Sequence, residues 1–428
     1  MARVDRANHM PAGQDSDIAV VGAGIVGVTT ALALQRASYR VVLIDGNPVG
    51  AMTSYGNTGV LVENPWLGFS TPGLIRRLPG ILVGQNPAVR IDAAFALRHF
   101  GLLARLVGHS LAAGADERVV AVHRLLRHSQ AIHKAWIKEA QAQDLLRETG
   151  WLKVFRTARS VAAFRPELEL LSQTRTRHRV LPDSDIGDLE PALVGPFVQG
   201  VLLEDACSVS SPLHLTHRYF DLFRRRGGRF EMAEVGRMEP SRRGWTLDCG
   251  ASSHAVDHVV IAVGPWASDL LAPLGYRVPL FWERGYHRHL RPGSGPALRR
   301  PVHEVDAGFV MTPQLQGVRV TSGVEFAHRD APPCYRQIDQ AVTKARAAAG
   351  LGEPLEPVAW LGSRPTLSDG LPMIGRAPRH SGLWFNFGHH HVGLSMAAGG
   401  AQLLADMMTG APPLVDPRSF DPARIIPA

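Results

Sequence analysis

Three glycines near the start of the chain and one aspartate after them have the types and spacing of a dinucleotide-binding turn. Gly22, Gly24 and Gly27 form a GxGxxG pattern. The first glycine permits a tight turn, the second lets backbone N–H groups approach a pyrophosphate, and the third lets a helix pack closely on a strand. Asp45 can accept hydrogen bonds from a ribose 2′-OH, and an acid at this point disfavours the 2′-phosphate of NADP. These residues alone leave NAD and FAD open.

A strand, a helix and a second strand must position these residues. The apolar, β-branched run IAVVG at 18–22 is typical of a strand that is buried on both faces. Ile25 and Val26 follow in the turn and lead into a segment of helical composition that breaks near Ser38. A second apolar run, YRVVLID, ends in Asp45. The stretch therefore predicts a βαβ unit that holds the phosphates of a dinucleotide at the start of its helix.

The loop after this unit favours FAD over NAD. Residues 50–66, GAMTSYGNTGVLVENPW, are small, polar and rich in glycine. A nicotinamide dehydrogenase normally continues here with an apolar crossover helix, whereas a flavoprotein brings a loop back across the ribityl chain and the ring. Further along, residues 258–264 predict another buried strand, and residues 383–410 predict a strand, a Gly/His turn and a long helix that begins near Leu394.

Several ordered motifs together resemble the FAD-dependent D-amino-acid oxidase superfamily, and most of all its bacterial D-amino-acid dehydrogenase branch. Relatives of that branch include D-hydroxyproline dehydrogenase, glycine oxidase and sarcosine oxidase. The resemblance covers residues 17–410 and is least distinctive at 67–191. It implies FAD, two domains and the oxidation of an amine beside a carboxylate. The motifs are the glycine fingerprint at 22–27, TSYGNTG at 53–59, ERGYH at 283–287, GSRPTLSDGLPMIG at 362–375 and GHHHVGLSMAAG at 388–399.

The expected fold class is α/β, with a Rossmann-type FAD-binding domain and a substrate domain that contains an antiparallel sheet and helices. Apolar residues recur at three- and four-residue spacing in 95–146, which predicts two long helices. Alternating stretches in 277–324 predict the antiparallel sheet, which in this fold forms the wall facing the flavin. We expect the chain to weave between the domains, with the FAD-binding domain at 17–66, 197–275 and 358–428 and the substrate domain at 67–196 and 276–357.

Arg364 is the residue that the resemblance assigns to the substrate carboxylate. A guanidinium fork can hold a carboxylate through two parallel hydrogen bonds, and burial strengthens that contact. Pro365 keeps the arginine out of helical conformation. The alternative interpretation is a structural ion pair with Asp369, five residues further along.

Three further contacts with the substrate are considered: one residue of the pair Tyr286 and His287, then Arg284, then Tyr55. Tyr286 and His287 point to opposite faces if they lie in a strand, so only one of them faces the substrate. The resemblance favours Tyr286 as that residue, and the alternative is that it packs in the core. Arg284 shares a face with Tyr286 and is either a second carboxylate ligand or a surface charge. Tyr55 is the third candidate.

The run His389-His390-His391 suggests a metal site, but we expect no metal. Three consecutive histidines in a turn cannot all face one ion, and no acid or cysteine is spaced to complete a site. Gly388 and His389 match the turn beside the flavin in the resembled family, where His389 also belongs among the catalytic candidates. His390 and His391 depart from that pattern, and either one reaches the substrate or both are exposed at the edge of the pocket.

The remaining cofactor contacts follow from the resemblance. The final helix should point its positive N-terminal end at the flavin and stabilise the anionic reduced ring. We expect non-covalent FAD, because no cysteine falls in the matching motifs. Besides Gly22, Gly24, Ile25, Val26, Gly27, Asp45 and Arg364, the expected FAD contacts are Thr53, Ser54, Asn57, Thr58, Gly59, Val235, Ala262, Gly264, Trp266, Gly388, His389, Val392, Gly393, Leu394 and Ser395.

Composition limits the partners and the location. The 46 basic residues exceed the 38 acidic ones by 8, but the arginines are scattered, which argues against nucleic-acid binding. Three cysteines without close spacing fit a reducing compartment. Residues 1–16 lack the apolar segment of a secretory signal, and no run of 18 apolar residues suggests a membrane span. We expect a cytoplasmic protein, with peripheral contact at the inner face of the membrane left open by the positive charge.

The leading functional hypothesis is oxidative deamination of a D-amino acid, or of a cyclic D-imino acid, by hydride transfer from the α-carbon to flavin N5. The resemblance implies that electrons then pass to a quinone or another acceptor. One alternative is a glycine- or sarcosine-type amine oxidase that uses oxygen. A second alternative is a flavoprotein that acts as an assembly partner without turnover.

Overall fold

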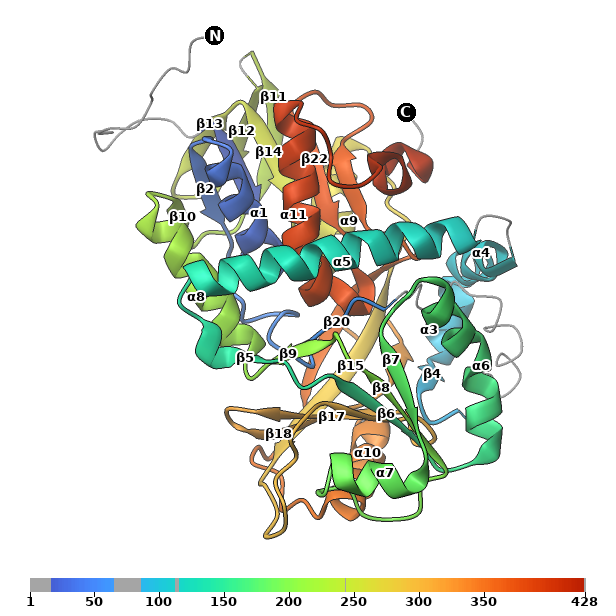
Figure 1. Ribbon diagram of the computed structural model, residues 1–428. Coiled ribbons are helices and arrows are strands. Elements are labelled where there is room, and N and C mark those ends of the chain that lie inside the picture. Colours follow the sequence, from blue (N-terminus) through green and yellow to red (C-terminus); the bar gives the residue numbers. More distant parts are fainter. Residues whose placement is uncertain (1–16, 65–85, 112–114, 243, 427–428) are drawn as a thin grey trace.

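The computed structural model describes residues 17–64, 86–111, 115–242 and 244–426, which form two interleaved α/β parts. The upper part in Figure 1 contains the nucleotide-type sheet, and the lower part contains a larger, mostly antiparallel sheet. Residues 1–16 and the first part of the expected substrate domain, at 67–85, lie outside the described residues.

The upper sheet is built on the predicted βαβ unit. Its strand order is β10-β2-β1-β14-β22-β21, and every neighbouring pair is parallel except β21–β22. All four residues of β1 and of β2 are buried, as expected of apolar strands covered on both faces. The strands are β1 (Ile18–Val21), β2 (Val41–Ile44), β10 (Arg229–Glu231), β14 (His258–Ile261), β21 (Met373–Arg376) and β22 (Leu383–Phe387).

Four helices cover one side of this sheet and the space below it. Helix α1 (Ile25–Arg36) packs on α11 (Gly393–Thr409) and on α8 (Pro212–Arg225). The long helix α5 (Ala115–Glu139) crosses in front of the lower part of α11 in Figure 1, and its Ser129 accepts the N–H of Gly399 on α11. Helix α11 is buried along most of its length, which explains its small, apolar sequence.

A small antiparallel sheet and a short helical segment complete the upper part. The sheet has the order β11-β12-β13, and two short helical turns follow β14. These elements are β11 (Arg237–Ser241), β12 (Gly244–Asp248), β13 (Ser253–Val256), η2 (Gly264–Trp266) and α9 (Ala267–Leu271).

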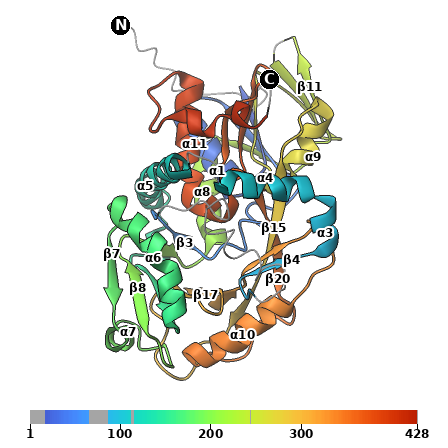
Figure 2. The same cartoon turned by 90° about the vertical axis from the view of Figure 1, so that its right-hand side faces the viewer.

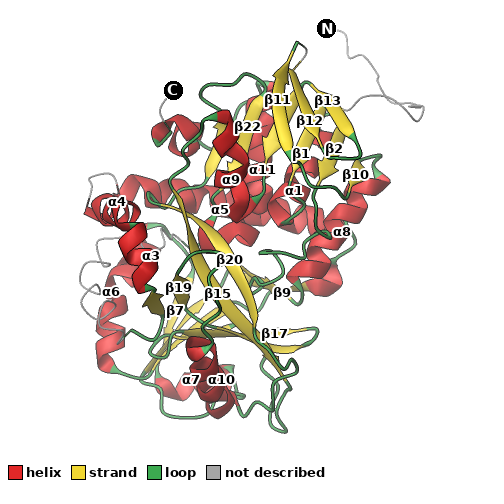
Figure 3. Cartoon of the chain, turned by 180° about the vertical axis from the view of Figure 1, so that it is seen from behind, coloured by secondary structure: helices red, strands yellow, loops and turns green. Residues whose placement is uncertain are grey.

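The lower sheet has the order β4-β19-β15-β18-β17-β16-β6-β8-β7, and β20 pairs with β15 away from this path. Strands β15 and β20 run between the two parts of the molecule (Figure 3). The strands are β4 (Val89–Ile91), β6 (Trp151–Phe155), β7 (His178–Leu181), β8 (Gln199–Leu203), β15 (Leu280–Leu290), β16 (Val302–Glu304), β17 (Phe309–Gln314), β18 (Gly317–Thr321), β19 (Val324–Phe326) and β20 (Trp360–Leu367).

Helices border the lower sheet, and a second small sheet joins the two parts. Helix α10 lies beneath β17 in Figure 2. The helices are α3 (Ala93–Arg98), α4 (Phe100–Leu111), α6 (Ala158–Gln173), α7 (Asp183–Leu189) and α10 (Arg336–Ala349), and the small sheet consists of β3 (Val60–Leu61), β9 (Cys207–Val209) and β5 (Leu146–Arg147).

The pattern of strand pairing refines two of the expectations. The segments at 197–275 and 358–428 were expected in the FAD-binding domain, yet β8 and β20 near their starts both pair in the lower sheet. The chain thus crosses between the parts after these strands rather than before them. The segment 95–146 contains most of α3 together with α4 and α5, rather than two long helices.

No helix of the described ranges combines the length and the apolar character needed to cross a bilayer.

A buried histidine joins three helices of the upper part. Nδ1 of His133 on α5 lies 2.9 Å from the hydroxyl of Tyr219 on α8, and Nε2 lies 2.9 Å from the carbonyl of Leu394 on α11. A carbonyl only accepts, so Nε2 carries a proton. Burial lowers the pKa of His133 to about 4, with the bond to Leu394 opposing the shift.

This histidine should make the fold sensitive to acid. The unfolded chain binds a proton at His133 near pH 6.5, but the folded chain does so only near pH 4. Between these values the unfolded state holds more protons, so the free energy of unfolding falls as the pH is lowered, by about 1.4 kcal/mol per pH unit for one group. We expect His133→Gln to reduce the slope of unfolding free energy against pH between 6.5 and 4 by about that amount, measured by urea denaturation. His214→Gln, at the exposed start of α8, should keep the wild-type slope; equal slopes for all three proteins would contradict the assignment.

Candidate active site

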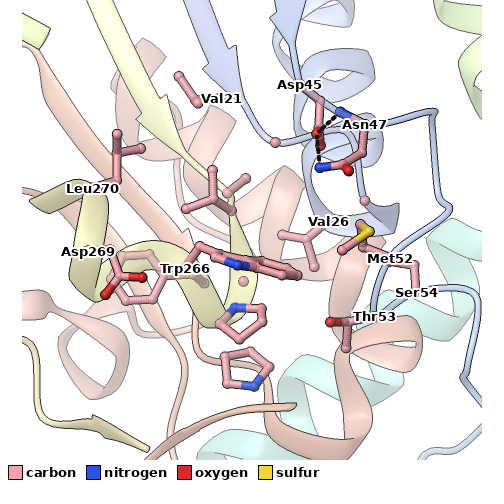
Figure 4. Close-up of a pocket in the computed structure, with 18 of the residues that line it drawn as sticks. Val21, Val26, Asp45, Asn47, Met52, Thr53, Ser54, Trp266, Asp269 and Leu270 are labelled. Carbon is pink, nitrogen blue, oxygen red and sulfur yellow. Dashed lines mark hydrogen bonds between the residues drawn. The ribbon is translucent and has the colours of Figure 1, made fainter. Parts of the chain in front are cut away.

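A cavity of about 1190 Å³ lies where the upper sheet, β15 and β20 meet. It is larger than the range of about 300–1,000 Å³ that is usual for small-molecule pockets. Its lining runs from the turn after β1 to the start of α11, and Figure 4 shows side chains such as Val26, Thr53 and Trp266 around it. The cavity can therefore take a long ligand together with a small one.

The glycine turn forms one end of the cavity. Gly22 has φ +105°, and a Cβ on it would lie 2.6 Å from the carbonyl oxygen of Ala262. No side chain of the N-cap residue, Gly24, caps helix α1, and the N–H of Ile25 donates to Oγ of Ser54 at 2.9 Å. Backbone N–H groups and the positive end of the helix dipole thus face the cavity, which is the arrangement that binds phosphate.

Asp45 stands beside this turn. One carboxylate oxygen accepts the N–H of Ala23 at 2.6 Å, and the other accepts the N–H of Asn47 at 2.8 Å, a bond drawn in Figure 4. Since Asp45 also lines the cavity, it both shapes the glycine turn and presents an acceptor for a ribose hydroxyl.

Arg364 lies across the opposite wall. In the antiparallel pair of β15 and β20 it stands opposite Glu283, and its guanidinium covers the neighbouring Gly285. A Cβ on Gly285 would lie 2.3 Å from Nη2 of Arg364, so only glycine leaves room for this placement. Nη1 of Arg364 is buried and has no hydrogen-bond partner among the described residues. The alternative of an ion pair with Asp369 does not hold, because Asp369 pairs with Arg424 at 2.6 Å.

All three consecutive histidines line the cavity. The alternative of exposure is wrong for His390, which is buried, whereas His391 keeps 25% of its side chain exposed. They lie in the short turn η4 (His390–Val392) and just before it, and His390 has φ +51°. Burial lowers the pKa of His389 to about 3 and that of His390 to about 4. Nδ1 of His391 lies 2.9 Å from Oε2 of Glu283.

Glu283 is a residue that the sequence analysis missed. Its side chain is completely buried beside His391 and opposite Arg364. Burial alone would raise the pKa of this carboxyl, but His391, His390 and Arg364 lower it below its ordinary value. The one available signal was the charge of Glu283 at the start of ERGYH, in a strand that is otherwise buried. Its partner could not be read from spacing, because Arg364 is far away in the sequence.

Tyr286 and Arg284 belong to a separate buried network. Tyr286 lines the cavity, but its hydroxyl donates to Glu325 at 2.6 Å and accepts the N–H of Cys334. Arg284 is fully buried, pairs with Glu325 at 3.1 Å and donates to the carbonyl of Ala331. Both alternatives for Arg284, a second carboxylate ligand and a surface charge, are therefore corrected: it holds the loop after β19.

Most of the expected contact residues line the cavity, and the others support its wall. Tyr55 packs its ring under the guanidinium of Arg319, 5.1 Å from the ring centre, and against Trp360. Ser395 ties α11 to β3 by donating to the carbonyl of Val60. Those lining the cavity are Gly22, Gly24, Ile25, Val26, Asp45, Thr53, Ser54, Asn57, Val235, Ala262, Gly264, Trp266, Tyr286, Arg364, Gly388, His389, Gly393 and Leu394. Those outside the lining are Gly27, Tyr55, Thr58, Gly59, Arg284, Val392 and Ser395.

Among the described residues, one trio brings potential metal ligands together. Ligand atoms of Glu231, Cys249 and His254 lie within 4.8 Å of one another. Nε2 of His254 is 2.7 Å from the Glu231 carboxylate, so a hydrogen bond already accounts for their closeness. None of the three lines the cavity.

A family model described as "FAD dependent oxidoreductase", DAO, matches residues 17–407. The chain belongs to the DAO family. Its cofactor is FAD, and the expectation of an FAD-dependent α/β oxidoreductase is confirmed.

Curated relatives match this DAO-family chain over nearly its whole length. A "D-amino-acid oxidase" of Bradyrhizobium diazoefficiens is 27% identical, covering 97% of this chain and 100% of the relative. A "D-amino acid dehydrogenase" of Cereibacter sphaeroides is 30% identical, covering 93% of each chain.

Solved structures share the fold. Glycine oxidase from Geobacillus kaustophilus has a TM-score of 0.71 at 20% identity, covering 95% of this chain and 98% of its own. L-proline dehydrogenase from P. horikoshii has a TM-score of 0.75 at 16% identity, covering 96% of this chain and 98% of its own.

The residues of the cavity fit FAD. The glycine turn, the start of α1 and Asp45 offer N–H donors and a carboxylate to a pyrophosphate and a ribose, and the uncapped start of α11 faces the same cavity. Arg364 lines the same cavity of about 1190 Å³. None of the three cysteines lines the cavity, and non-covalent binding of FAD stays a prediction.

Proposed function

We propose that this protein oxidises a D-amino acid, or a cyclic D-imino acid, at its α-carbon and passes the electrons to a quinone or another acceptor. One observation carries the proposal. The Arg364 guanidinium lines the cavity against Gly285, and its buried Nη1 has no partner among the described residues. A buried, fork-shaped cation with free donors is suited to a carboxylate.

The protein's own residues bind and orient the substrate in this proposal. Arg364 holds the carboxylate, and Trp360, on the same strand, adds an aromatic surface to the cavity. FAD, when bound, would supply the acceptor for the two electrons that leave the α-carbon with its hydrogen. Water then hydrolyses the released imine to a 2-oxo acid and ammonia, whereas a cyclic amine gives a cyclic imine.

The names of the relatives support the D configuration. The curated relatives that match nearly the whole chain are named for D-amino acids. The solved structures share only the fold, and they include an enzyme named for L-proline. The chirality is therefore the part of the proposal that depends most on sequence likeness.

Anaerobic bleaching of the flavin tests the proposal directly. The purified yellow protein is mixed without oxygen with D-amino acids, their L-enantiomers, D-hydroxyproline and N-methylglycine, and the visible flavin absorbance is followed. We expect D-forms or D-hydroxyproline to bleach it. Bleaching by L-forms alone would contradict the chirality, and no bleaching by any amine would favour the alternative of a non-catalytic assembly partner.

A glycine- or sarcosine-type oxidase is the second candidate, favoured by the structural likeness to glycine oxidase. The two candidates differ in the acceptor. Peroxide formed in air in step with substrate consumption would favour the oxidase, whereas turnover that needs an added quinone would favour the dehydrogenase.

The location follows from the acceptor in this proposal. A membrane quinone would require contact with the inner face of the membrane, and the net charge of +8 suits an anionic surface. Sedimentation with vesicles that contain anionic lipids, compared with neutral vesicles, tests this contact.

Gly285→Ala should weaken substrate binding without unfolding the protein. The new methyl group would meet the far end of a flexible side chain, 2.3 Å from Nη2 of Arg364, so the guanidinium moves and the strand does not. Loss of a charge-assisted hydrogen bond costs about 1.5–3 kcal/mol, which predicts a rise of about 10- to 100-fold in the KM for the amino acid. Steady-state kinetics and the thermal midpoint measure both effects. Gly295→Ala, with no atom near its Cβ position, is the matched control; an unchanged KM for Gly285→Ala would contradict the placement of Arg364.

A further inference from the structure

The loop at 53–58 lies between β2 and β3 and borders the cavity. Thr53, Ser54 and Asn57 line the cavity, and Figure 4 labels the side chains of Thr53 and Ser54 there. The loop belongs to neither a helix nor a strand, so contacts with other elements must hold its shape. One such contact comes from the upper part, where Oγ of Ser54 accepts the N–H of Ile25.

A buried arginine of the lower sheet holds the loop from another side. Arg319 lies on β18 and is 2% exposed. Its Nη1 donates to the carbonyl of Tyr55 at 2.7 Å and to the carbonyl of Asn57 at 2.6 Å. The guanidinium also lies 5.1 Å from the centre of the Tyr55 ring. One side chain of the lower sheet thus contacts two residues of the loop.

The bond to Tyr55 fixes the direction of a peptide group beside the cavity. In a trans peptide the C=O of one residue and the N–H of the next point in opposite directions. The carbonyl of Tyr55 points to Arg319, so the N–H of Gly56 points away from Arg319. Gly56 lines the cavity, and no hydrogen bond within the described residues uses its N–H. The contact with Arg319 therefore leaves a backbone donor of a lining residue available to a ligand.

A buried histidine and an acid orient the guanidinium in turn. Nε of Arg319 lies 3.0 Å from Nε2 of His289 on β15, and Nδ1 of His289 is hydrogen-bonded to Glu356. Arginine only donates, so Nε2 accepts and Nδ1 carries the proton of the ring. The backbone N–H of His289 donates to the same carboxylate at 2.9 Å. A chain of contacts thus runs from Glu356 through His289 and Arg319 to the loop, with a donor facing an acceptor at each step.

Arg319 stays a cation in this setting. Burial lowers the pKa of Arg319 to about 10, while Tyr55 and Glu356 oppose the shift. The guanidinium is therefore charged at pH 7. Hydrogen bonds from a charged donor are shorter and stronger than those between neutral groups, which suits Arg319 to hold two carbonyls in place.

We propose that Arg319 is the positioning residue that shapes the loop at 53–58 for FAD, and that His289 and Glu356 hold Arg319 in place. Arg319 does not line the cavity, so it acts through the loop. A loop that already has its bound shape costs less to order when the ligand binds. The inference goes beyond the proposed function, because it needs only the cofactor of the family and no particular substrate.

Release of FAD from diluted holoenzyme tests the inference. Holoenzyme of wild type and of Arg319→Met is diluted in steps, and the fluorescence of the released FAD gives its dissociation constant. We expect Arg319→Met to raise this constant about 10- to 100-fold, the range for losing a hydrogen bond from a charged group. Equal constants for the two proteins would overturn the inference, whatever happens to stability.

Arg319→Lys keeps the test decisive where Arg319→Met does not fold. Lysine retains a charged donor but lacks the fork that meets both carbonyls and the imidazole at once. Its FAD dissociation constant should therefore lie between those of wild type and Arg319→Met. A wild-type constant in Arg319→Lys would overturn the role given to the guanidinium.

Arg300→Met is the matched control for a merely structural role. Arg300 is another mostly buried arginine of the lower part, and it donates to the carbonyls of Thr149 and Leu189. None of these three residues lines the cavity. Both Arg300→Met and Arg319→Met should lower the thermal midpoint at saturating FAD, but only Arg319→Met should raise the dissociation constant of FAD. An equal rise in both variants would assign the effect to general destabilisation and overturn the inference.

His289→Phe tests the support of Arg319. The ring keeps its place but loses the acceptor for Nε–H, and loss of one ordinary hydrogen bond predicts a rise of about 2- to 10-fold in the FAD dissociation constant. Because His289 acts through Arg319, the double variant with Arg319→Met should be no weaker than Arg319→Met alone. Fully additive effects would show that His289 acts on FAD independently of Arg319 and would overturn the chain of contacts.

Proteolysis reports on the loop itself. Tyr55 is a half-buried aromatic residue, and chymotrypsin cleaves after such residues once their backbone becomes mobile. We expect cleavage after Tyr55, identified by fragment mass, to be faster in Arg319→Met holoenzyme than in wild type or Arg300→Met. Wild-type resistance at Tyr55 in Arg319→Met would contradict the inference. A wild-type flavin that no amine reduces would overturn the proposed function instead and would leave these measurements of FAD and of the loop unaffected.

Discussion

Replacing Arg364 with alanine is expected to lower kcat/KM for amino acids by about 10²- to 10³-fold while the flavin stays bound. Truncating one member of a buried, hydrogen-bonded charge pair costs about 2–5 kcal/mol. Two losses add here. The substrate carboxylate loses the paired hydrogen bonds of the guanidinium, and Glu283 loses one of the positive charges that lower its pKa. Arg364→Lys keeps the charge without the fork and should recover only part of the activity.

The comparison of two substrates makes this prediction specific. An amino acid and the primary amine that lacks its carboxylate are both offered to wild type and to Arg364→Ala under anaerobic conditions. The wild type should prefer the amino acid strongly, and the variant should lose that preference. The control is Arg288→Ala on the neighbouring strand β15, whose guanidinium donates to the carbonyl of Pro357. A variant that still prefers the amino acid as wild type does would show that another group binds the carboxylate.

The nucleotide-binding part could be predicted from sequence because its signals are short in range. Strand β1, the glycine turn, α1 and β2 lie within 28 residues of one another, from Ile18 to Asp45, and each contributes its own local pattern. Gly22 adopts a positive φ, and glycines at the start of α1 let other backbone atoms and a ligand come close to the helix. The structure places these residues where the spacing predicts them.

The substrate wall could be predicted only in part, because its contacts join distant segments. The register of β15 with β20 sets Glu283 opposite Arg364, and nothing in either segment alone encodes that register. Arg284 illustrates the same limit. Its charge suggested a ligand or a surface position, but Glu325 and the carbonyls after β19 neutralise and bury it.

The histidine run shows how burial overrides composition. Three consecutive polar residues suggest an exposed turn, yet the cavity lies against β15, β20 and α11, and all three rings line it. The positive φ of His390 lets the chain turn sharply enough for this. Sequence alone could therefore identify the turn but not the environment of its side chains.

Gly27→Ala is expected to abolish retention of FAD, or folding itself. A Cβ at this position would lie 1.7 Å from the carbonyl oxygen of Gly22, which is backbone and cannot swing aside. Helix α1 would have to move away from the end of β1, yet it is packed on α8 and α11. Because Ile25 and the glycine turn move with the helix, the phosphate site is lost together with the packing.

A graded series tests whether close packing, rather than any added methyl group, causes the loss. A Cβ on Gly24 would meet only Oγ of Ser54, a side-chain atom 3.0 Å away, so Gly24→Ala should weaken FAD binding without preventing folding. Gly187→Ala in helix α7 meets no atom within 4 Å and should be neutral or slightly stabilising. The bound flavin per chain, from visible absorbance after desalting, and the thermal midpoint should both fall in the order Gly187→Ala, Gly24→Ala, Gly27→Ala. Full flavin content in Gly27→Ala would mean that α1 does not approach the glycine turn this closely, and the phosphate site would have to be placed elsewhere.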